Sequence, residues 1–431
     1  MRMELRDVNA VVDRVTQFIA SETGLDVLKT GPIFCEIHRL FFNSWVNRGC
    51  RIDKVRCSKS FWFTVDGFKP RGELADLWKW MFSLLHFVMA ILLRRKVFAC
   101  GARDKQWVKS FYHGAAARID FRGRPDFLVQ RNEVLREGLK RHLLSLGMNA
   151  GQAEAVKVVL PEDLLEGCIL QIKLFMIAVR FMGRNEICSE DFIENVSSAC
   201  LVAATLRFGW EFTYKEHALP TLIFRNHISW EHARVASKVI LTEDYEGYIL
   251  DESIRRKCVY SKKTRNCRFT HDPQGKRLLC IPFVSGFASG MHWTGDSDYV
   301  RDLRFDERDR DVLWSVLKSL SQTEEILTRY HPCRCEGVSL STFPTETFDG
   351  SGVKEVVFVG WTQGFFECLD AGIPARIILT RRFLGLSDGG NEYFHALEQR
   401  GVLEYILAAS EVSGFPSGAA NIMKPAGIAE C

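Results

Sequence analysis

The most constraining feature of this chain is the alternation of short apolar runs with helical stretches over residues 221–254. TLIF (221–224) reads as a short buried strand, WEHARVASK (230–238) as a helix, VILT (239–242) as a second strand and EDYEGYILDESI (243–254) as a second helix. Strands that run parallel need a crossover element between them, and a helix is the usual one. This stretch therefore predicts a parallel sheet covered by helices.

A second series of the same kind follows a polar linker at 255–277. The strands predicted in it are RLLCIPFV (277–284), EEILTRYHP (324–332), VKEVVFVG (353–360) and PARIIL (374–379). The helices are RDVLWSVLKSLSQ (310–322) and TQGFFECLDAG (362–372). The fold class that accounts for both series is α/β, with two Rossmann-like domains that face each other across a cleft. We divide the chain into 1–260 and 261–431.

The N-terminal half adds a helical extension before the first domain. Long helical patterns are expected near the N-terminus and at 127–147, 161–183 and 191–208. Short strands are expected at 61–65 and 96–100. The helix at 191–208 is expected to open at Ser189, with Glu190 and Asp191 in its first turn. Residues 411–431 are expected to pack poorly, because they are rich in glycine and proline.

Polar residues stand where ligands bind such folds, beyond the carboxyl ends of the strands. Pro332 stops one strand, so Arg329 and His331 lie at its carboxyl end. Thr362 and Gln363 open a helix, where a hydroxyl and free backbone N–H groups could hold a phosphate oxygen. A strand-end histidine bonded to a neighbouring carbonyl is the alternative for His331.

These motifs, taken in order, resemble the C-terminal half of a GT-B glycosyltransferase. The pattern is a His-Pro strand end, then Gly-Trp-Thr-Gln and Glu-x4-Gly-x-Pro, within about residues 221–380. It is most similar to the bacterial capsule and lipopolysaccharide transferases that use CMP-sugars. The resemblance implies that His331 and Thr362 hold the nucleotide phosphate and that Glu367 hydrogen-bonds the ribose. A solvated helix glutamate is the alternative for Glu367.

A base for the acceptor hydroxyl is expected in the N-terminal half, because an inverting transfer needs a group that takes the acceptor's proton. The candidates are His227, Glu231, His113 and Asp120. We prefer His227, because it alone follows a predicted core strand. On the donor side, Ser285 and Gly286 open the loop SGFASG, which either approaches a pyrophosphate or is a plain connection, since it is neither a P-loop nor a GxGxxG.

Charge is distributed unevenly along the chain. Residues 1–150 have 26 basic and 15 acidic residues, a net charge of +11, against 31 and 38, or −7, for 151–431. The basic half favours an anionic membrane surface or acceptor. Within it, the sixteen residues 78–93 would form a helix of about 24 Å, shorter than the ~30 Å hydrocarbon core. They read as a buried helix or an interfacial one. We expect peripheral, salt-sensitive contact with a membrane through 71–124.

Composition narrows the class of protein. With 47% hydrophobic and 26% charged residues the chain is globular. Fourteen cysteines are spread over the chain, mostly in apolar runs and without a CxxC pair, which predicts structural thiols in a reduced, cytoplasmic protein. Asp296-Ser297-Asp298 has the spelling of a metal-binding DxD but lies in the wrong half of the fold. No metal and no cofactor is therefore expected, and the nucleotide-sugar is a substrate.

We therefore expect a glycosyltransferase that moves a sugar, a CMP-activated ulosonic acid such as Kdo or a sialic acid, onto a surface polysaccharide or lipid-linked acceptor. Its expected location is the inner face of the bacterial membrane. A polyol-phosphate transferase of the teichoic-acid type, which resembles this group in its His-Pro motif, is one alternative. A nucleic-acid-binding module built on the basic half is another, but no recognition motif supports it, and no nucleic-acid partner is expected.

Overall fold

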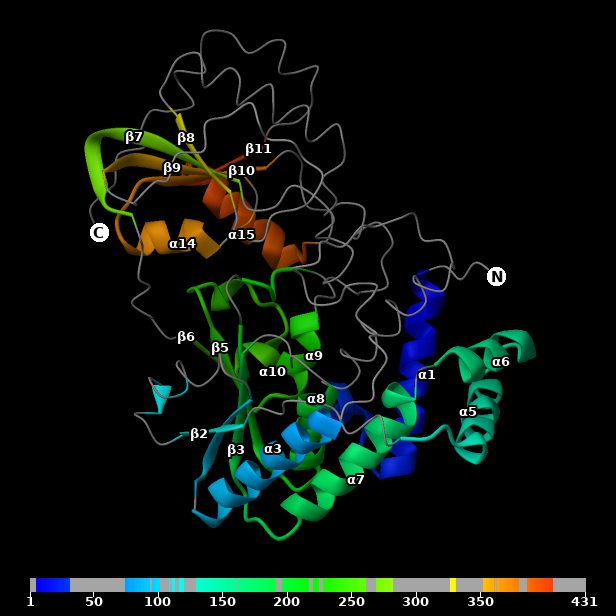
Figure 1. Cartoon of the computed structure of the whole chain (residues 1–431). Coiled ribbons are helices and arrows are strands. Elements are labelled where there is room, and N and C mark those ends of the chain that lie inside the picture. The colour runs from blue at the N-terminus through cyan, green and yellow to red at the C-terminus, as the bar shows by residue number, and fades with distance from the viewer. Residues whose placement is uncertain are drawn as a thin grey trace.

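The computed structural model describes the chain in several stretches (Figure 1). The described residues are 5–31, 74–93, 95–100, 108, 111–112, 116–119, 129–160, 162–190, 196–216, 220–224, 228–260, 269–281, 326–330, 352–359, 361, 363–379 and 386–405.

Six parallel strands of the N-terminal half form the first sheet, in the order β2-β1-β3-β4-β5-β6. They are β1 (Val97–Cys100), β2 (Ala116–Ile119), β3 (Glu186–Glu190), β4 (Glu211–Lys215), β5 (Lys238–Leu241) and β6 (Cys258–Tyr260). Because every pair is parallel, each strand is followed by a crossover to the next.

Five parallel strands of the C-terminal half form the second sheet, in the order β11-β10-β9-β7-β8. They are β7 (His271–Ile281), β8 (Ile326–Tyr330), β9 (Val353–Val359), β10 (Ala375–Leu379) and β11 (Leu403–Tyr405). In both sheets the first strand along the chain lies between the second and the third, as in the flavodoxin-like variant of doubly wound folds. The prediction of an α/β chain with two parallel sheets is confirmed.

Helices precede and cover the first sheet. The described ones are α1 (Leu5–Thr23), η1 (Val27–Thr30), α3 (Leu74–Leu92), α5 (Glu133–Ser145), α6 (Ala150–Val159), the π-helical turn η3 (Asp163–Gly167), α7 (Cys168–Val179), α8 (Val196–Arg207), α9 (Ile228–Val235), η4 (Glu246–Tyr248) and α10 (Glu252–Arg255). The second sheet carries α14 (Gln363–Asp370) and α15 (Asp388–Gln399) on the side that faces the first sheet (Figure 1).

The core of the first sheet lies mainly on one of its faces. Phe98 of β1 packs against Phe87 of α3 and against Trp210, with ring centroids 5.7 and 5.3 Å apart. The opposite face is covered as well, because Val108 and Tyr112 pack against Ala99, Cys188 and Ile240. The sheet is therefore buried on both sides, as the continuous apolar character of its strands requires.

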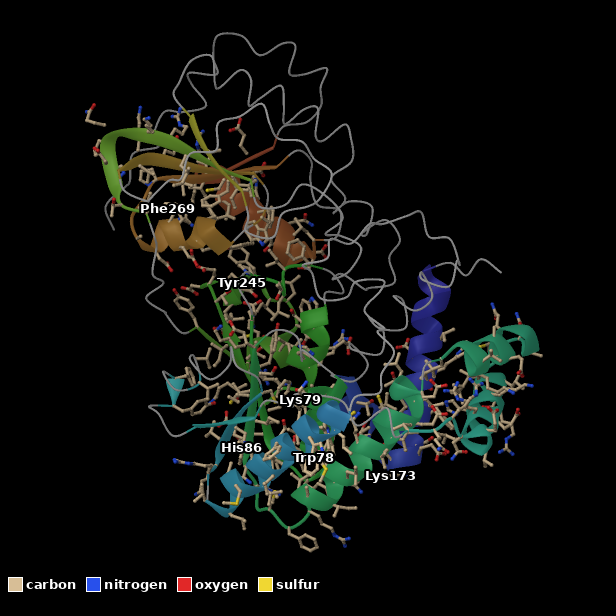
Figure 2. All side chains as sticks on the ribbon, in the orientation of Figure 1. Trp78, Lys79, His86, Lys173, Tyr245 and Phe269 are labelled. Carbon is tan, nitrogen blue, oxygen red and sulfur yellow. The ribbon has the colours of Figure 1, made fainter. Side chains whose placement is uncertain are left out.

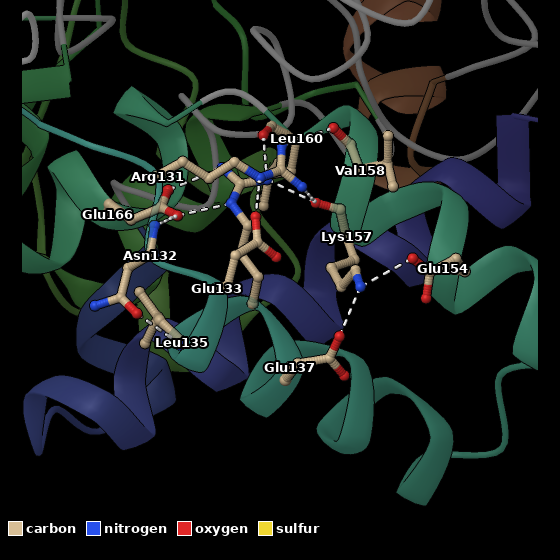
Figure 3. Close-up of polar contacts among 11 residues, drawn as sticks. Arg131, Asn132, Glu133, Leu135, Glu137, Glu154, Lys157, Val158, Leu160 and Glu166 are labelled. Carbon is tan, nitrogen blue, oxygen red and sulfur yellow. Dashed lines mark hydrogen bonds and ion pairs between the residues drawn. The ribbon is translucent and has the colours of Figure 1, made fainter.

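A buried ion pair holds the helices that lead from β2 to β3 (Figure 3). The Arg136 guanidinium donates to both carboxylate oxygens of Glu166 at 2.7 and 2.9 Å, and to the carbonyls of Lys157 and Leu160 at 2.6 and 2.8 Å. Arg136 is fully buried and Glu166 nearly so. One side chain thus joins α5, the end of α6 and η3, and it satisfies two carbonyls at a helix end.

The start of α15 joins the two sheets. Ser387, its N-cap, donates through its backbone N–H and its hydroxyl to the carbonyl of Ile223, at 2.8 and 2.9 Å. Gly389 and Gly390 follow, and a Cβ added to them would lie 1.9 Å from the carbonyl oxygen of Tyr248 and 2.2 Å from that of Ile223. Only glycine allows this close approach of backbone to backbone.

Several predicted elements differ from the observed ones. The predicted strand 221–224 is a buried turn with a single bridge to Leu386, and the strand at this point of the sheet is β4. The predicted helix opening at Ser189 is wrong, because Ser189 and Glu190 end β3 and the helix begins at Val196. The helix predicted at 243–254 is two short turns, η4 and α10.

The predicted linker 255–277 contains regular structure, since β6 and the first half of β7 lie within it. The first sheet ends at Tyr260 and the second begins at His271. The strands predicted at 96–100, 277–284, 324–332, 353–360 and 374–379 are confirmed as β1, β7, β8, β9 and β10. The predictions at 61–65, 310–322 and 411–431 lie outside the described residues.

The apolar stretch 78–93 belongs to α3, which is buried on one face only. Trp80 and Phe87 lie in the core, whereas Trp78 and Leu85 are exposed. The buried-helix interpretation fits the inward side, whereas the interfacial interpretation stays a prediction for the exposed side. None of the helices in the described part of the chain has the length and apolar character needed to cross a bilayer.

Candidate functional site

Both sheets have a topological switch point, where neighbouring strands send their following segments to opposite sides. In the first sheet it lies between β1 and β3, and in the second between β7 and β9. Open α/β sheets bind ligands in the crevice that forms beyond the carboxyl ends of the strands at this point. The two switch points are therefore the places to look for a site.

The switch point of the second sheet gathers the segments that the sequence predicted for the nucleotide. β7 ends four residues before Ser285, β8 ends one residue before His331, and β9 ends three residues before Thr362. The register pairs Ile281 with Tyr330 and Cys280 with Phe358, so the three strand ends lie side by side.

The predicted nucleotide-binding residues are described to different degrees. Ser285, Gly286, His331 and Thr362 lie outside the described residues. Arg329 is the fourth residue of β8, and Gln363 is the first residue of α14; only their backbone is described. Glu367 lies in the middle of α14 and is partly exposed.

Helix α14 is held against the second sheet by its apolar face. Phe365, Phe366 and Cys368 are buried, and the Phe365 ring meets Phe358 of β9 at 6.4 Å. Because α14 follows β9 directly, its N-terminus lies at the carboxyl edge of the sheet, where free backbone N–H groups attract an anion. Glu367 lies between buried neighbours but keeps contact with solvent.

Trp361, in the Gly-Trp-Thr-Gln motif, has a packing role. Its ring stacks on Phe394 of α15 at 4.7 Å and meets Phe366 edge-on at 5.2 Å. This contact fixes the chain between the end of β9 and the start of α14. The motif thus contains one residue that positions the turn and, in our prediction, one that binds phosphate.

An ion pair lies at the carboxyl edge of the first sheet, between β3 and β4 and next to the switch point. Glu190 ends β3 and Lys215 ends β4, the two strands are neighbours in register, and the Lys215 ammonium donates to the Glu190 carboxylate. Both side chains are largely buried. Opposite charges at the carboxyl end of central strands could orient an acceptor hydroxyl or a phosphate, although here each charge already has a partner.

Glu216, which follows Lys215 in the chain, has a buried carboxylate that accepts several hydrogen bonds. The backbone N–H and the hydroxyl of Thr221 donate to it at 2.9 and 3.0 Å, and Thr242 and the Tyr245 hydroxyl donate to it as well. Burial raises the pKa of Glu216, and these hydrogen bonds oppose the rise. Burial, together with the Glu216 charge, also raises the pKa of Tyr245. Glu216 has no solvent exposure and cannot touch a substrate, so its role is structural.

Tyr245 connects the hydrogen-bond network of Glu216 to the C-terminal half of the protein (Figure 2). Its ring lies 5.8 Å from that of Tyr393 in α15, and Tyr248 contacts the same ring at 5.1 Å. The carboxyl edge of the first sheet is thereby coupled to the helix that covers the second.

Of the predicted catalytic residues, His227, His113 and Asp120 lie outside the described residues. Glu231 is described, in the first turn of α9. It pairs with Arg234 at 2.6 Å, and its charge, after burial, helps to raise the pKa of Asp13 in α1. Its carboxylate also lies near Gly31, at the end of η1. Glu231 therefore lies at the helical extension and would have to leave its ion pair to act as a base.

Sequence reasoning missed Glu190, Lys215, Glu216 and Tyr245. The signal that could have found Lys215 and Glu216 is the run EFTYKE (211–216), a short aromatic strand that ends in two charged residues. Within the described part of the chain no group of three metal-ligating side chains occurs. No protein-family model matches this sequence, and a search of curated proteins found no match.

Proposed function

We propose that this protein is a GT-B glycosyltransferase that transfers a sugar from a CMP-activated donor, an ulosonic acid such as Kdo or a sialic acid, to a hydroxyl of a surface polysaccharide or lipid-linked acceptor. The observation that carries the proposal is the adjacency of β8, β7 and β9. These three strands end at the same edge of one sheet, at its switch point. The sequence motifs that follow them span some eighty residues of the chain.

In the proposed donor site, His331 and Arg329 hold the phosphate from the end of β8. Thr362 and Gln363 hold it from the start of α14, and Ser285 and Gly286 approach it from β7. Glu367 accepts from the ribose hydroxyls. Basic groups and helix-terminal N–H groups stabilise the nucleotide as it leaves.

In the reaction, the bond between the anomeric carbon and the phosphate oxygen breaks and CMP departs. A bond forms between the anomeric carbon and the acceptor oxygen, and a base takes the acceptor's proton. His227 is our first choice for that base, followed by Glu231, His113 and Asp120. Because the acceptor is surface-bound or lipid-linked, we place the protein at the cytoplasmic face of the bacterial membrane.

The His331→Ala substitution tests the donor site. Losing a charge-assisted hydrogen bond should cost about 1.5–3 kcal/mol, or about ten- to a hundredfold in the affinity for CMP measured by calorimetric titration. The His86→Ala variant, changed at an exposed histidine of α3, should bind CMP like the parent protein. Unchanged affinity after His331→Ala would remove His331 from the site.

A thermal-shift screen separates the proposal from its alternatives. A ligand at a hundred times its dissociation constant stabilises by about 2.7 kcal/mol. Stabilisation by CMP supports the proposal, and stabilisation by UDP or GDP alone would indicate a UDP- or GDP-activated donor instead. Stabilisation by CDP-glycerol alone would favour a polyol-phosphate transferase, and by RNA or DNA alone a nucleic-acid-binding module.

A further inference from the structure

The outward face of α3 is largely apolar from Trp78 to Leu92, with Lys79 and His86 as its exposed polar residues. Its exposed side chains recur every three or four residues, at Trp78, Met81, Phe82, Leu85, Met89 and Leu92. Trp78 is 58% exposed and Leu92 is 69% exposed. The opposite face, with Trp80 and Phe87, is already in the core. A surface helix of a soluble domain normally has charged and polar residues on its outward face, so this stripe needs an explanation.

A second apolar stripe lies on the neighbouring helix α7. Its exposed side chains are Leu170, Leu174 and Ile177, followed by Phe181, which is 86% exposed. The rings of Trp80 and Phe175 meet at 6.0 Å between the two helices, which lie side by side (Figure 1). We call the exposed side chains of α3 and α7, with Phe181, the two-helix patch.

The charged residues in the segments that carry the two-helix patch are mainly basic. Segment 74–96, which includes all of α3, contains Lys79, Arg94, Arg95 and Lys96 and one acidic residue, Asp76. Segment 168–185 contains Lys173, Arg180 and Arg184 and no Asp or Glu. Lys79 and Lys173 are exposed on the two helices themselves (Figure 2). Seven basic residues against one acidic residue in these two segments match the charge of an anionic bilayer.

We propose that the two-helix patch docks on the surface of an anionic lipid bilayer. The two helices lie in the plane of the interface, their apolar side chains reach the acyl boundary, and the lysines and arginines contact the lipid phosphates. The buried faces of the helices stay in the protein core. The inference goes beyond the proposed reaction and does not depend on it.

A lipid surface fits this patch better than a protein partner. Protein interfaces are depleted in lysine, which loses side-chain entropy and hydration when it is buried between two proteins. At a bilayer, by contrast, Lys79 and Lys173 can extend to the headgroups while their neighbours enter the apolar layer. A protein partner would also have to supply acidic groups around an apolar centre of matching shape.

Vesicle co-sedimentation of the full chain tests the proposal. The vesicles are phosphatidylcholine, either alone or with about one third phosphatidylglycerol, which supplies the anionic charge. We expect binding to the anionic vesicles. The Phe82→Asp and Phe181→Asp variants should each bind at least about tenfold more weakly, since each loses the burial of a large apolar side chain. Val134→Asp, at an apolar residue that is 80% exposed on α5, is the matched control and should bind normally.

Salt separates the apolar contribution from the electrostatic one. Raising NaCl from about 0.1 M to about 1 M shortens the Debye length from about 10 Å to about 3 Å. Binding should weaken but not vanish, because the apolar contact remains. The Lys79→Glu and Lys173→Glu variants should weaken binding to anionic vesicles at low salt.

Three results would overturn the proposal. The first is equal binding to neutral and anionic vesicles at low salt. The second is unchanged binding by the two aspartate variants. The third is the absence of vesicle binding together with a dimer that Phe82→Asp dissociates, which would assign the patch to a second copy of the chain. Because no donor is present, these outcomes are independent of the proposed transferase activity.

Discussion

His232 is a buried histidine without a hydrogen-bond partner. It lies on the inner side of α9, is 2% exposed, and its ring meets those of Tyr214 and Phe212 of β4 at 5.3 and 6.4 Å. Neither ring nitrogen has a hydrogen-bond partner. Burial lowers the pKa of His232 from 6.5 to about 4. We predict that this one side chain makes the folded protein sensitive to mild acid.

The size of the effect follows from the pKa difference. Below pH 6.5 the unfolded chain binds a proton at His232 that the folded protein does not bind until about pH 4. The stability that depends on the neutral ring is therefore fully present above pH 6.5 and is lost as the pH falls toward 4. Between about pH 7.5 and about pH 5 this loss amounts to about 2 kcal/mol, at 1.36 kcal/mol per pH unit over the range in which only the unfolded state is protonated.

The His232→Leu variant tests this prediction by urea unfolding at the two pH values. Near pH 7.5 the variant should be as stable as the parent or more stable, because leucine removes two unpaired buried nitrogens. The difference in the free energy of unfolding between the variant and the parent should be about 2 kcal/mol larger near pH 5 than near pH 7.5. His395→Leu, at an exposed histidine of α15, should leave the pH dependence unchanged. An identical loss of stability in the parent and in His232→Leu would refute the reasoning.

Two further predictions concern stability. Glu166→Gln leaves the Arg136 charge buried without its counter-ion and should lower the free energy of unfolding by about 3–5 kcal/mol, measured by chemical unfolding. Replacing both residues by apolar ones should recover much of this stability. A loss below about 1 kcal/mol in Glu166→Gln would contradict the role of the buried pair. Gly390→Ala places a Cβ 2.2 Å from the Ile223 carbonyl oxygen and should destabilise the folded protein by about 1–3 kcal/mol. The control Gly151→Ala, on α6, should be neutral or stabilising. Equal effects of the two substitutions would contradict the close approach of the backbone at Gly390.

Most of the second sheet could be predicted from the sequence, except for its short last strand, β11. Four of its five strands are runs such as VKEVVFV that are rich in apolar and β-branched residues and bounded by glycine, proline or charged residues. A polar residue just after such a run lies at the carboxyl edge of the sheet in any parallel arrangement. The sequence therefore placed His331 and Thr362 at strand ends. That these ends are neighbours depends on the strand order β9-β7-β8, which pairing between distant residues decides.

The first sheet contains strands that no local pattern reveals. In β3 the run EICSE has a glutamate at each end, which favours a helix or a loop when read alone. In the folded protein Glu186 accepts from the Tyr112 hydroxyl and Glu190 pairs with Lys215, so both charges are satisfied by residues distant in sequence. Conversely, TLIF (221–224) is apolar enough for a strand. It forms a turn because the Glu216 carboxylate accepts a hydrogen bond from the backbone N–H of Thr221.

The sequence by itself determined that residues 78–93 form an apolar helix beside a basic cluster, because composition and periodicity are local properties. It could not decide which of its faces is buried, since apolar residues lie on every side of this helix. Contact with the first sheet and with Phe175 chose the face of Trp80 and Phe87. The stripe that begins at Trp78 stayed outside because the core of one domain can cover only one side of a helix.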